Sequence, residues 1–200
     1  MKLFTLTLTL FFICFFSFSQ KKTKEFGLNI YNVNSYGMQY KIGEDATMWR
    51  FRLNSSDLIL GREGKMFSFN FDNGNQIRTR QVNLTAAIGR EKRKEIAPNF
   101  QFIYGMELLT RYSYRGIADF NFITDFKALS VGLSAVVGAR YALNDKIFIG
   151  AELLPSVQYV NSKTINRNRR FFGASDITRY SGIFAGFDSS SALLSIGIKF

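Results

Sequence analysis

Two glutamates, Glu107 and Glu152, are the side chains in this sequence that could act as an acid and a base on one substrate. A pair of carboxyl groups does this when one gives a proton and the other accepts a proton or attacks. Both glutamates lie in segments that also carry arginines, and unpaired charge is costly in a narrow interior, so structural ion pairs are the simpler interpretation. We therefore predict a network of eight charged side chains: Lys41, Arg50, Arg52, Glu107, Arg111, Arg140, Glu152 and Lys199.

Other motifs for catalysis or metal binding are weak. The chain has no histidine, no G-x-S-x-G or P-loop sequence and no zinc-ligand spacing. Residues 72–75, Asp-Asn-Gly-Asn, offer calcium-type oxygens, but the run is much shorter than an EF-hand loop and Asn-Gly is a common turn. We expect no enzymatic activity, no metal site and no cofactor.

The first residues have the pattern of a secretory signal peptide. Lys2 supplies a positive charge, residues 3–16 are apolar, and Ser17 and Ser19 are small residues placed to precede a cleavage site. The alternative is a transmembrane anchor, which needs about 20 apolar residues and is therefore longer than this run. We predict a signal peptide over residues 1–19.

The remaining residues, 20–200, have the length of one domain and an unusual composition. The whole chain has a net charge of +11 and contains 22 phenylalanines, a combination that favours separate apolar and charged faces. The one cysteine, Cys14, lies in the predicted signal peptide, so the domain has neither a disulfide nor a thiolate metal site.

Apolar and polar residues alternate with a period of two along most of this domain, which indicates β-strands rather than helices. Eight segments show the alternation, and their apolar faces fall within residues 26–30, 36–42, 49–53, 82–88, 100–114, 129–143, 147–159 and 194–200. In the first pair the boundaries are open, because residues 26–43 also fit one strand with a lead-in segment.

The lengths of the connections alternate as well. Short turns are expected at residues 43–45, 91–99 and 144–146, and longer polar stretches at 54–76, 116–127 and 161–180. Short turns at one end and long loops at the other are typical of a transmembrane β-barrel. We predict an all-β, up-and-down antiparallel transmembrane β-barrel of about eight strands.

The direction of the apolar face distinguishes this barrel from a soluble, lipocalin-like one, whose apolar face would point inward. Three features favour an apolar face toward lipid. Aromatic residues gather at strand ends, as in interfacial girdles; glycine and serine enrich the polar face; and the chain ends on an apolar strand. The strand-end aromatic residues are Tyr36, Trp49, Tyr112, Tyr114, Tyr141 and Tyr159.

The last strand carries a family resemblance. Leu194, Ile196, Ile198 and Phe200 share one face and end the chain on an aromatic residue. In this the sequence resembles small, eight-stranded outer-membrane β-barrel proteins of Gram-negative bacteria, of the Bacteroidota and PorT-like type. The resemblance implies that these four residues are the signal read by the barrel-insertion machinery. The known enzymatic outer-membrane barrels resemble one another in needing a histidine base, so the absence of histidine in this sequence excludes their mechanisms.

The predicted location is the outer membrane, and the predicted role is structural, adhesive or accessory, through long extracellular loops around a plugged lumen. A narrow channel or small-ligand transporter, and a soluble periplasmic carrier, are the alternatives. The expected partners are outer-membrane lipid, lipopolysaccharide and the insertion machinery, with no nucleic acid, and the protein is expected to be a monomer. Arg167, Arg169 and Arg170 are candidates to contact lipopolysaccharide phosphates, although a solvated loop also explains them.

Overall fold

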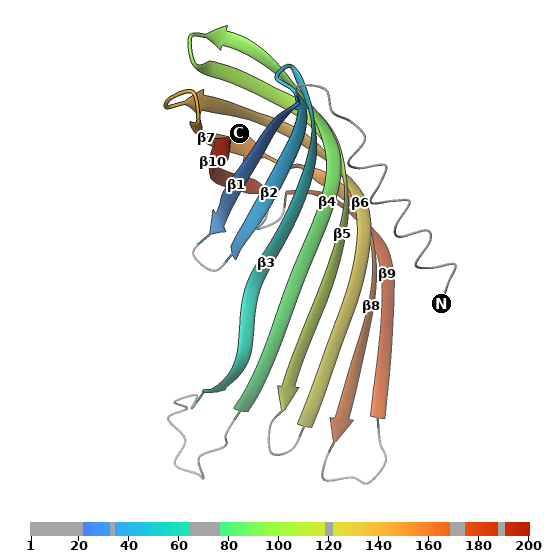
Figure 1. Cartoon of the computed structure of the whole chain (residues 1–200). Helices are drawn as coiled ribbons and strands as arrows, with labels where there is room; N and C mark the ends of the chain where they lie inside the picture. The colour runs from blue at the N-terminus through green and yellow to red at the C-terminus, as the bar shows by residue number, and fades with distance from the viewer. Residues whose placement is uncertain (1–21, 33–34, 65–76, 119–121, 169–174, 188–190) are drawn as a thin grey trace, which may run out of the picture.

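The computed structural model describes residues 22–32, 35–64, 77–118, 122–168, 175–187 and 191–200. Ten strands form one antiparallel sheet (Figure 1). They are β1 (Thr23–Asn32), β2 (Ser35–Glu44), β3 (Thr47–Gly64), β4 (Ile77–Ala97), β5 (Phe100–Ala118), β6 (Phe122–Ala142), β7 (Ile147–Leu153), β8 (Ser156–Asn168), β9 (Ser175–Gly186) and β10 (Ala192–Lys199). None of the described residues forms a helix long and apolar enough to cross a membrane.

The ten strands occupy eight positions in a closed barrel. Strands β7 and β8 both pair with the long strand β6, and Pro155, which has no N–H to give to the ladder, lies between them. Strands β10 and β9 pair with β7 and β8 respectively, so they share the next position. The predicted all-β antiparallel barrel of eight strand positions is confirmed.

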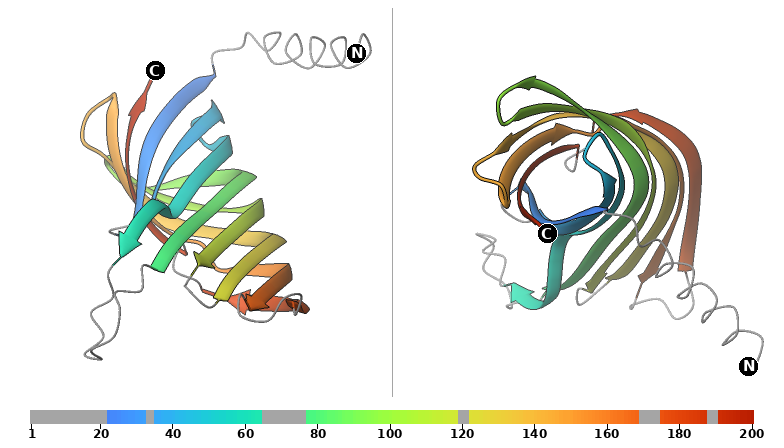
Figure 2. Two further views of the ribbon diagram at one scale, coloured as in Figure 1. Left: turned by 90° about the horizontal axis from the view of Figure 1, so that it is seen from below. Right: turned by 45° about the horizontal axis from the view of Figure 1, so that its top comes forward.

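The barrel closes between the first and last strands. Phe26 pairs with Ile198 and Ile30 with Leu194. Phe200 completes the seam, because its N–H donates to the Lys24 carbonyl at 2.9 Å and its carbonyl accepts from the Lys24 N–H at 3.1 Å. Figure 2 shows the resulting ring of strands around a central axis. The aromatic end of the chain is therefore part of the barrel wall.

Period-two alternation positions the side chains, as the burial of β1 and β10 illustrates. In β1 the outward residues Phe26, Leu28 and Ile30 are exposed, whereas Glu25 and Asn29 are buried inside. This arrangement is the opposite of that in a soluble protein, because large apolar side chains face outward and charged side chains face the interior. Leu194, Ile196, Ile198 and Phe200 are all on the outer face of the last strand, between 50% and 64% exposed.

Several predicted loops are strand. The expected turn at 91–99 belongs mostly to β4, which runs to Ala97, and the turn itself is Pro98 and Asn99, with Asn99 in the left-handed region at φ 65°. The expected loop at 54–76 is strand as far as Gly64, and the expected loop at 116–127 is strand over residues 116–118 and 122–127. The first pair is a true hairpin of β1 and β2, which excludes a single strand with a lead-in.

The expected loop at 161–180 was also wrong, because β8 continues to Asn168 and β9 begins at Ser175. The physical reason lies in β9, which was missed entirely. Nearly all of its residues are exposed on both faces, so no buried face imposed an alternating sequence.

Strands β3–β6, β8 and β9 continue well beyond the β1–β2 hairpin (Figure 1). We name the end reached by these strands, where residues 65–76, 119–121 and 169–174 make the connections, the loop end. The opposite end holds the β2–β3, β4–β5 and β6–β7 turns and the C-terminus, and we name it the turn end. The predicted signal peptide, residues 72–75 and the predicted contacts of Arg169 and Arg170 lie outside the described residues.

Candidate functional site: a charge plug inside the barrel

Among the residues that the structure describes, nine charged side chains are buried inside the closed part of the barrel, and we name them the charge plug. Each is less than a tenth exposed. The members are Glu25, Lys41, Arg50, Arg52, Glu91, Arg93, Glu107, Arg140 and Glu152.

Strand register places the centre of the plug. Lys41 on β2 pairs with Arg50 on β3, Arg50 with Gly89 on β4, and Gly89 with Glu107 on β5. All four residues therefore form one row on the inner face. Gly89 has no side chain, and a Cβ added there would lie 2.6 Å from the Cα of Glu107. This glycine leaves the room in which the Arg50 Nε approaches Glu107 Oε2 to 3.2 Å.

Arg50 is the hub of the plug, because its guanidinium contacts three carboxylates. Nη2 donates to Glu152 Oε2 at 2.6 Å, Nη1 donates to Glu91 Oε2 at 3.0 Å, and Nε faces Glu107. The planar fork of an arginine suits such a set of oxygens better than a lysine does. The Arg50 side chain is fully buried, so each contact is shielded from water.

Glu91 is the second hub, and it binds cations on three strands. Lys41 Nζ lies 2.9 Å from its Oε2, and Arg93 Nη2 lies 2.5 Å from its Oε1, in addition to the Arg50 contact. Lys41 also reaches Glu152 at 3.2 Å. Glu91 therefore ties β2, β3 and β4 together from inside the barrel.

Glu25 links the seam of the barrel to the opposite wall. Arg93 forms a bidentate pair with it, Nη1 to Oε1 and Nη2 to Oε2, both at 2.8 Å. Arg140 Nη1 donates to Glu25 Oε1 at 2.6 Å, and its guanidinium lies 3.9 Å above the Phe148 ring. Bidentate geometry makes such pairs strong and directional.

Arg52 forms the layer next to the hub. Its Nη2 donates to Glu107 Oε1, and its Nη1 donates to the Tyr31 hydroxyl at 2.7 Å. Its guanidinium also lies 5.7 Å from the centre of the Tyr31 ring. The chemistry of the plug is therefore electrostatic closure, since five cations and four carboxylates contact one another.

The structure places six of the predicted network residues in this plug: Lys41, Arg50, Arg52, Glu107, Arg140 and Glu152. Both glutamates share Arg50, which is an ion-pair arrangement rather than an open carboxylate pair. Arg111 lies toward the loop end, where its Nε donates to Thr85 Oγ1 at 3.2 Å.

Lys199 lies outside the plug, at the turn end. Its Nζ is 2.9 Å from Asp45 Oδ1, on the exposed β2–β3 turn. Hydrogen bonds from Lys199 and from the Thr23 hydroxyl lower the pKa of the Asp45 carboxyl. This pair connects the last strand to the rim and takes no part in closing the interior.

Sequence reasoning missed Glu25, Glu91 and Arg93. The signal was present: Glu91 and Arg93 continue the inward series of Ala87 and Gly89 on β4. They were assigned to a turn because their outward neighbours on β4 are lysine and arginine rather than apolar residues. The three missed residues carry two of the four carboxylates of the plug and one of its five cations.

The outer wall is the counterpart of the plug. Its aliphatic and aromatic side chains point away from the barrel axis, whereas a soluble carrier of the lipocalin type would need them inside. The strand-end aromatics Tyr36, Trp49, Tyr112, Tyr141 and Tyr159 are between 42% and 56% exposed. The fold and the site together define a class: a closed eight-stranded antiparallel β-barrel with an apolar exterior and a charged, filled interior.

Comparison with known proteins agrees with this class at the level of fold. The chain is similar to a major outer membrane protein from Thermus thermophilus, with a TM-score of 0.55 and 10% sequence identity over 90% of this chain and 100% of that one. No protein-family model and no curated protein matches the sequence.

Proposed function

We propose that this chain is an integral outer-membrane protein with a plugged lumen, and that its role is structural, adhesive or accessory. The observation that carries the proposal is the combination of a lipid-compatible outer wall with the buried charge plug. A wall of this kind satisfies its backbone groups by strand pairing and presents apolar side chains to lipid.

The plug favours this role over a narrow channel. An eight-stranded barrel has an interior just wide enough for side chains to fill. Here Arg50, Glu91 and Glu152 meet in that interior with side chains at most 1% exposed. Moving an ion through would require separating buried pairs, which is strongly unfavourable.

Contacts with other envelope components would then form at the loop end. Strands β4, β5 and β6 are 19 to 21 residues long, about twice the length that a transmembrane strand needs. Their extensions and the connecting residues offer a surface outside the bilayer. Arg167, exposed at the end of β8, is the described member of the three arginines proposed to contact lipopolysaccharide phosphates.

Insertion by the barrel-assembly machinery and a monomeric state are parts of the same proposal. The outward series Leu194, Ile196, Ile198 and Phe200 on β10 supports the first. Barrel closure within one chain supports the second, because the β1–β10 seam needs no second copy. The finer assignment to the Bacteroidota and PorT-like type rests on the same last strand and on the signal-peptide pattern.

Ion conduction tests the plugged state. In planar lipid bilayers the wild-type protein is expected to give no current steps. A double variant, Arg50→Gln with Glu107→Gln, should lower the stability of the barrel and still conduct no ions, because the neighbouring carboxylates and cations remain.

The matched control is Asp45→Asn with Lys199→Gln, which removes a cation–carboxylate pair at the exposed rim. It should leave both stability and conduction nearly unchanged. Reproducible wild-type current steps whose size changes in the Arg50 and Glu107 double variant, and not in the rim variant, would replace the plugged role with a channel.

A further inference from the structure

The barrel wall is complete only in the half that contains the plug. Strand β1 pairs with β10 as far as Ile30 and Leu194. Beyond these residues, toward the loop end, β9 takes the position in the sheet that β10 holds in the closed half. Among the described residues, β9 pairs with β8 alone, and β3 beyond Ser56 pairs with β4 alone. Toward the loop end, the sheet is therefore a curved wall with two edges, β3 and β9.

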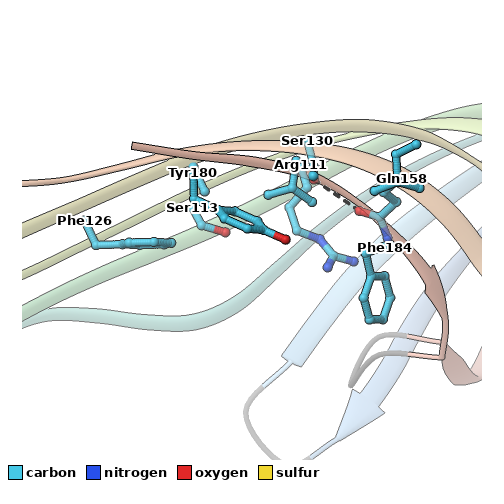
Figure 3. Close-up of a pocket in the computed structure, with 11 residues that line it drawn as sticks. Arg111, Ser113, Phe126, Ser130, Gln158, Tyr180 and Phe184 are labelled. Atoms are coloured by element: carbon cyan, nitrogen blue, oxygen red, sulfur yellow. Dashed lines mark hydrogen bonds between the residues drawn. The ribbon is translucent and has the colours of Figure 1, made fainter. Parts of the chain in front are cut away.

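A cavity of about 410 Å³ lies on the inner face of this curved wall, next to the β9 edge (Figure 3). Strands β5, β6, β8 and β9 contribute its lining. Register aligns its centre, because Arg111 pairs with Ser130, Ser130 with Val160, and Val160 with Gly182. The volume is within the range of small-molecule sites.

One part of the cavity is polar and ordered. Ser130 Oγ donates to Gln158 Oε1 at 3.1 Å, and Gln158 Nε2 donates to Ser156 Oγ at 2.7 Å. Arg111 stands at the β5 end of the aligned row, and its Nε donates to Thr85 Oγ1 on the neighbouring strand β4 at 3.2 Å. Figure 3 shows the Tyr180 hydroxyl directed toward Arg111.

The other part is apolar and belongs largely to the edge. Phe184 and the Tyr180 ring come from β9, with Phe126 from β6 and Val160 from β8. Tyr180 is 63% exposed and Phe184 41%, although both lie on the inner face of the wall. An arginine beside an exposed aromatic surface matches a molecule with an anionic head and an apolar chain.

We propose that this cavity binds a single-chain anionic amphiphile, with its carboxylate or phosphate head at Arg111 and its chain along Phe126, Val160 and Phe184. The charge plug has the complementary sign, because its five cations outnumber its four carboxylates. Within the described part of the chain no strand pairs with the second edge of β9, and this edge gives the chain of the ligand a route from the side.

Native mass spectrometry of the full chain in a neutral detergent tests the proposal with four probes: dodecyl phosphate, dodecanoate, dodecanol and inorganic phosphate. The two anionic amphiphiles are expected to bind, one per chain. Dodecanol should bind at least about tenfold more weakly than the anionic amphiphiles, because it forms no charge-assisted hydrogen bond with Arg111. Inorganic phosphate should not bind detectably, since it has no chain.

The key variant is Arg111→Gln, which should weaken binding of both anionic probes about tenfold. The matched control is Arg115→Gln, on the same face of β5 but outside the cavity lining, where the arginine Nε donates to Gln81 at 3.0 Å. It should bind like the wild type. Ala128→Leu adds volume to the lining and should reduce binding without touching a charge.

Four results would overturn the proposal. Equal binding of dodecanol and dodecyl phosphate would mean capture by the apolar surface alone. Unchanged binding in Arg111→Gln would show that the anionic head does not bind at Arg111. Tight binding of inorganic phosphate would show that the site binds a free anion. Retention of the anionic probes in Ala128→Leu would place them elsewhere on the barrel.

Discussion

Replacing Arg50 by glutamine is expected to lower the free energy of unfolding by about 3–5 kcal/mol, the cost of leaving buried charge without its partner. The guanidinium contacts Glu91, Glu107 and Glu152, and glutamine cannot reach or neutralise three carboxylates. Urea unfolding of the protein refolded into lipid vesicles measures the change.

Lys199→Gln is the matched control for this prediction. It also removes a cation from an ion pair, but the partner Asp45 has a side chain 63% exposed. Exposed pairs contribute about 0–1 kcal/mol, so the variant should unfold almost like the wild type. An Arg50→Gln protein as stable as Lys199→Gln would show that the buried contacts do not hold the barrel together.

Replacing Leu133 by arginine is expected to lower the free energy of unfolding in lipid vesicles by about 2–4 kcal/mol. Leu133 lies at the middle of the outer wall, paired with Leu108 on β5 and Val157 on β8, and all three point outward. An arginine at position 133 has to bury its charged guanidinium in the hydrocarbon or extend it to the membrane–water interface. The measurement is urea unfolding in vesicles.

Ile96→Arg serves as the comparison, because Ile96 is also an exposed apolar residue but lies next to the β4–β5 turn. Arginine near or beyond an interface changes stability by about 0–1 kcal/mol. Equal effects at positions 133 and 96, both small, would mean that the middle of the wall does not face hydrocarbon.

The sequence predicted the elements that have one buried face. In β1, β5 and β10 every second residue is constrained by the interior, so the alternation is visible and the antiparallel, eight-position barrel follows from it. A closed barrel requires the last strand to pair with the first, and the structure shows this pairing between β10 and β1.

Sequence reasoning missed the parts of the chain where no buried apolar or polar face imposes an alternating pattern, or where charged residues stand on both faces. Strand β9 has two exposed faces, so its sequence carries no alternation. On β4, charged residues stand on both faces beyond Gly89, which resembles a turn unless the inward series is followed. The contacts of Glu25 with Arg93 and Arg140 join residues far apart in the chain, and pairing of that kind depends on barrel closure.

The most direct test of a lipid-facing closed barrel is electrophoresis of isolated outer membranes in SDS, with and without boiling. We predict that the full chain is found in the membrane fraction and that the unheated protein migrates at a different position from the boiled one, because closed strand pairing resists SDS. A soluble protein that migrates identically before and after boiling would contradict both the outer-membrane location and the outward direction of the apolar wall.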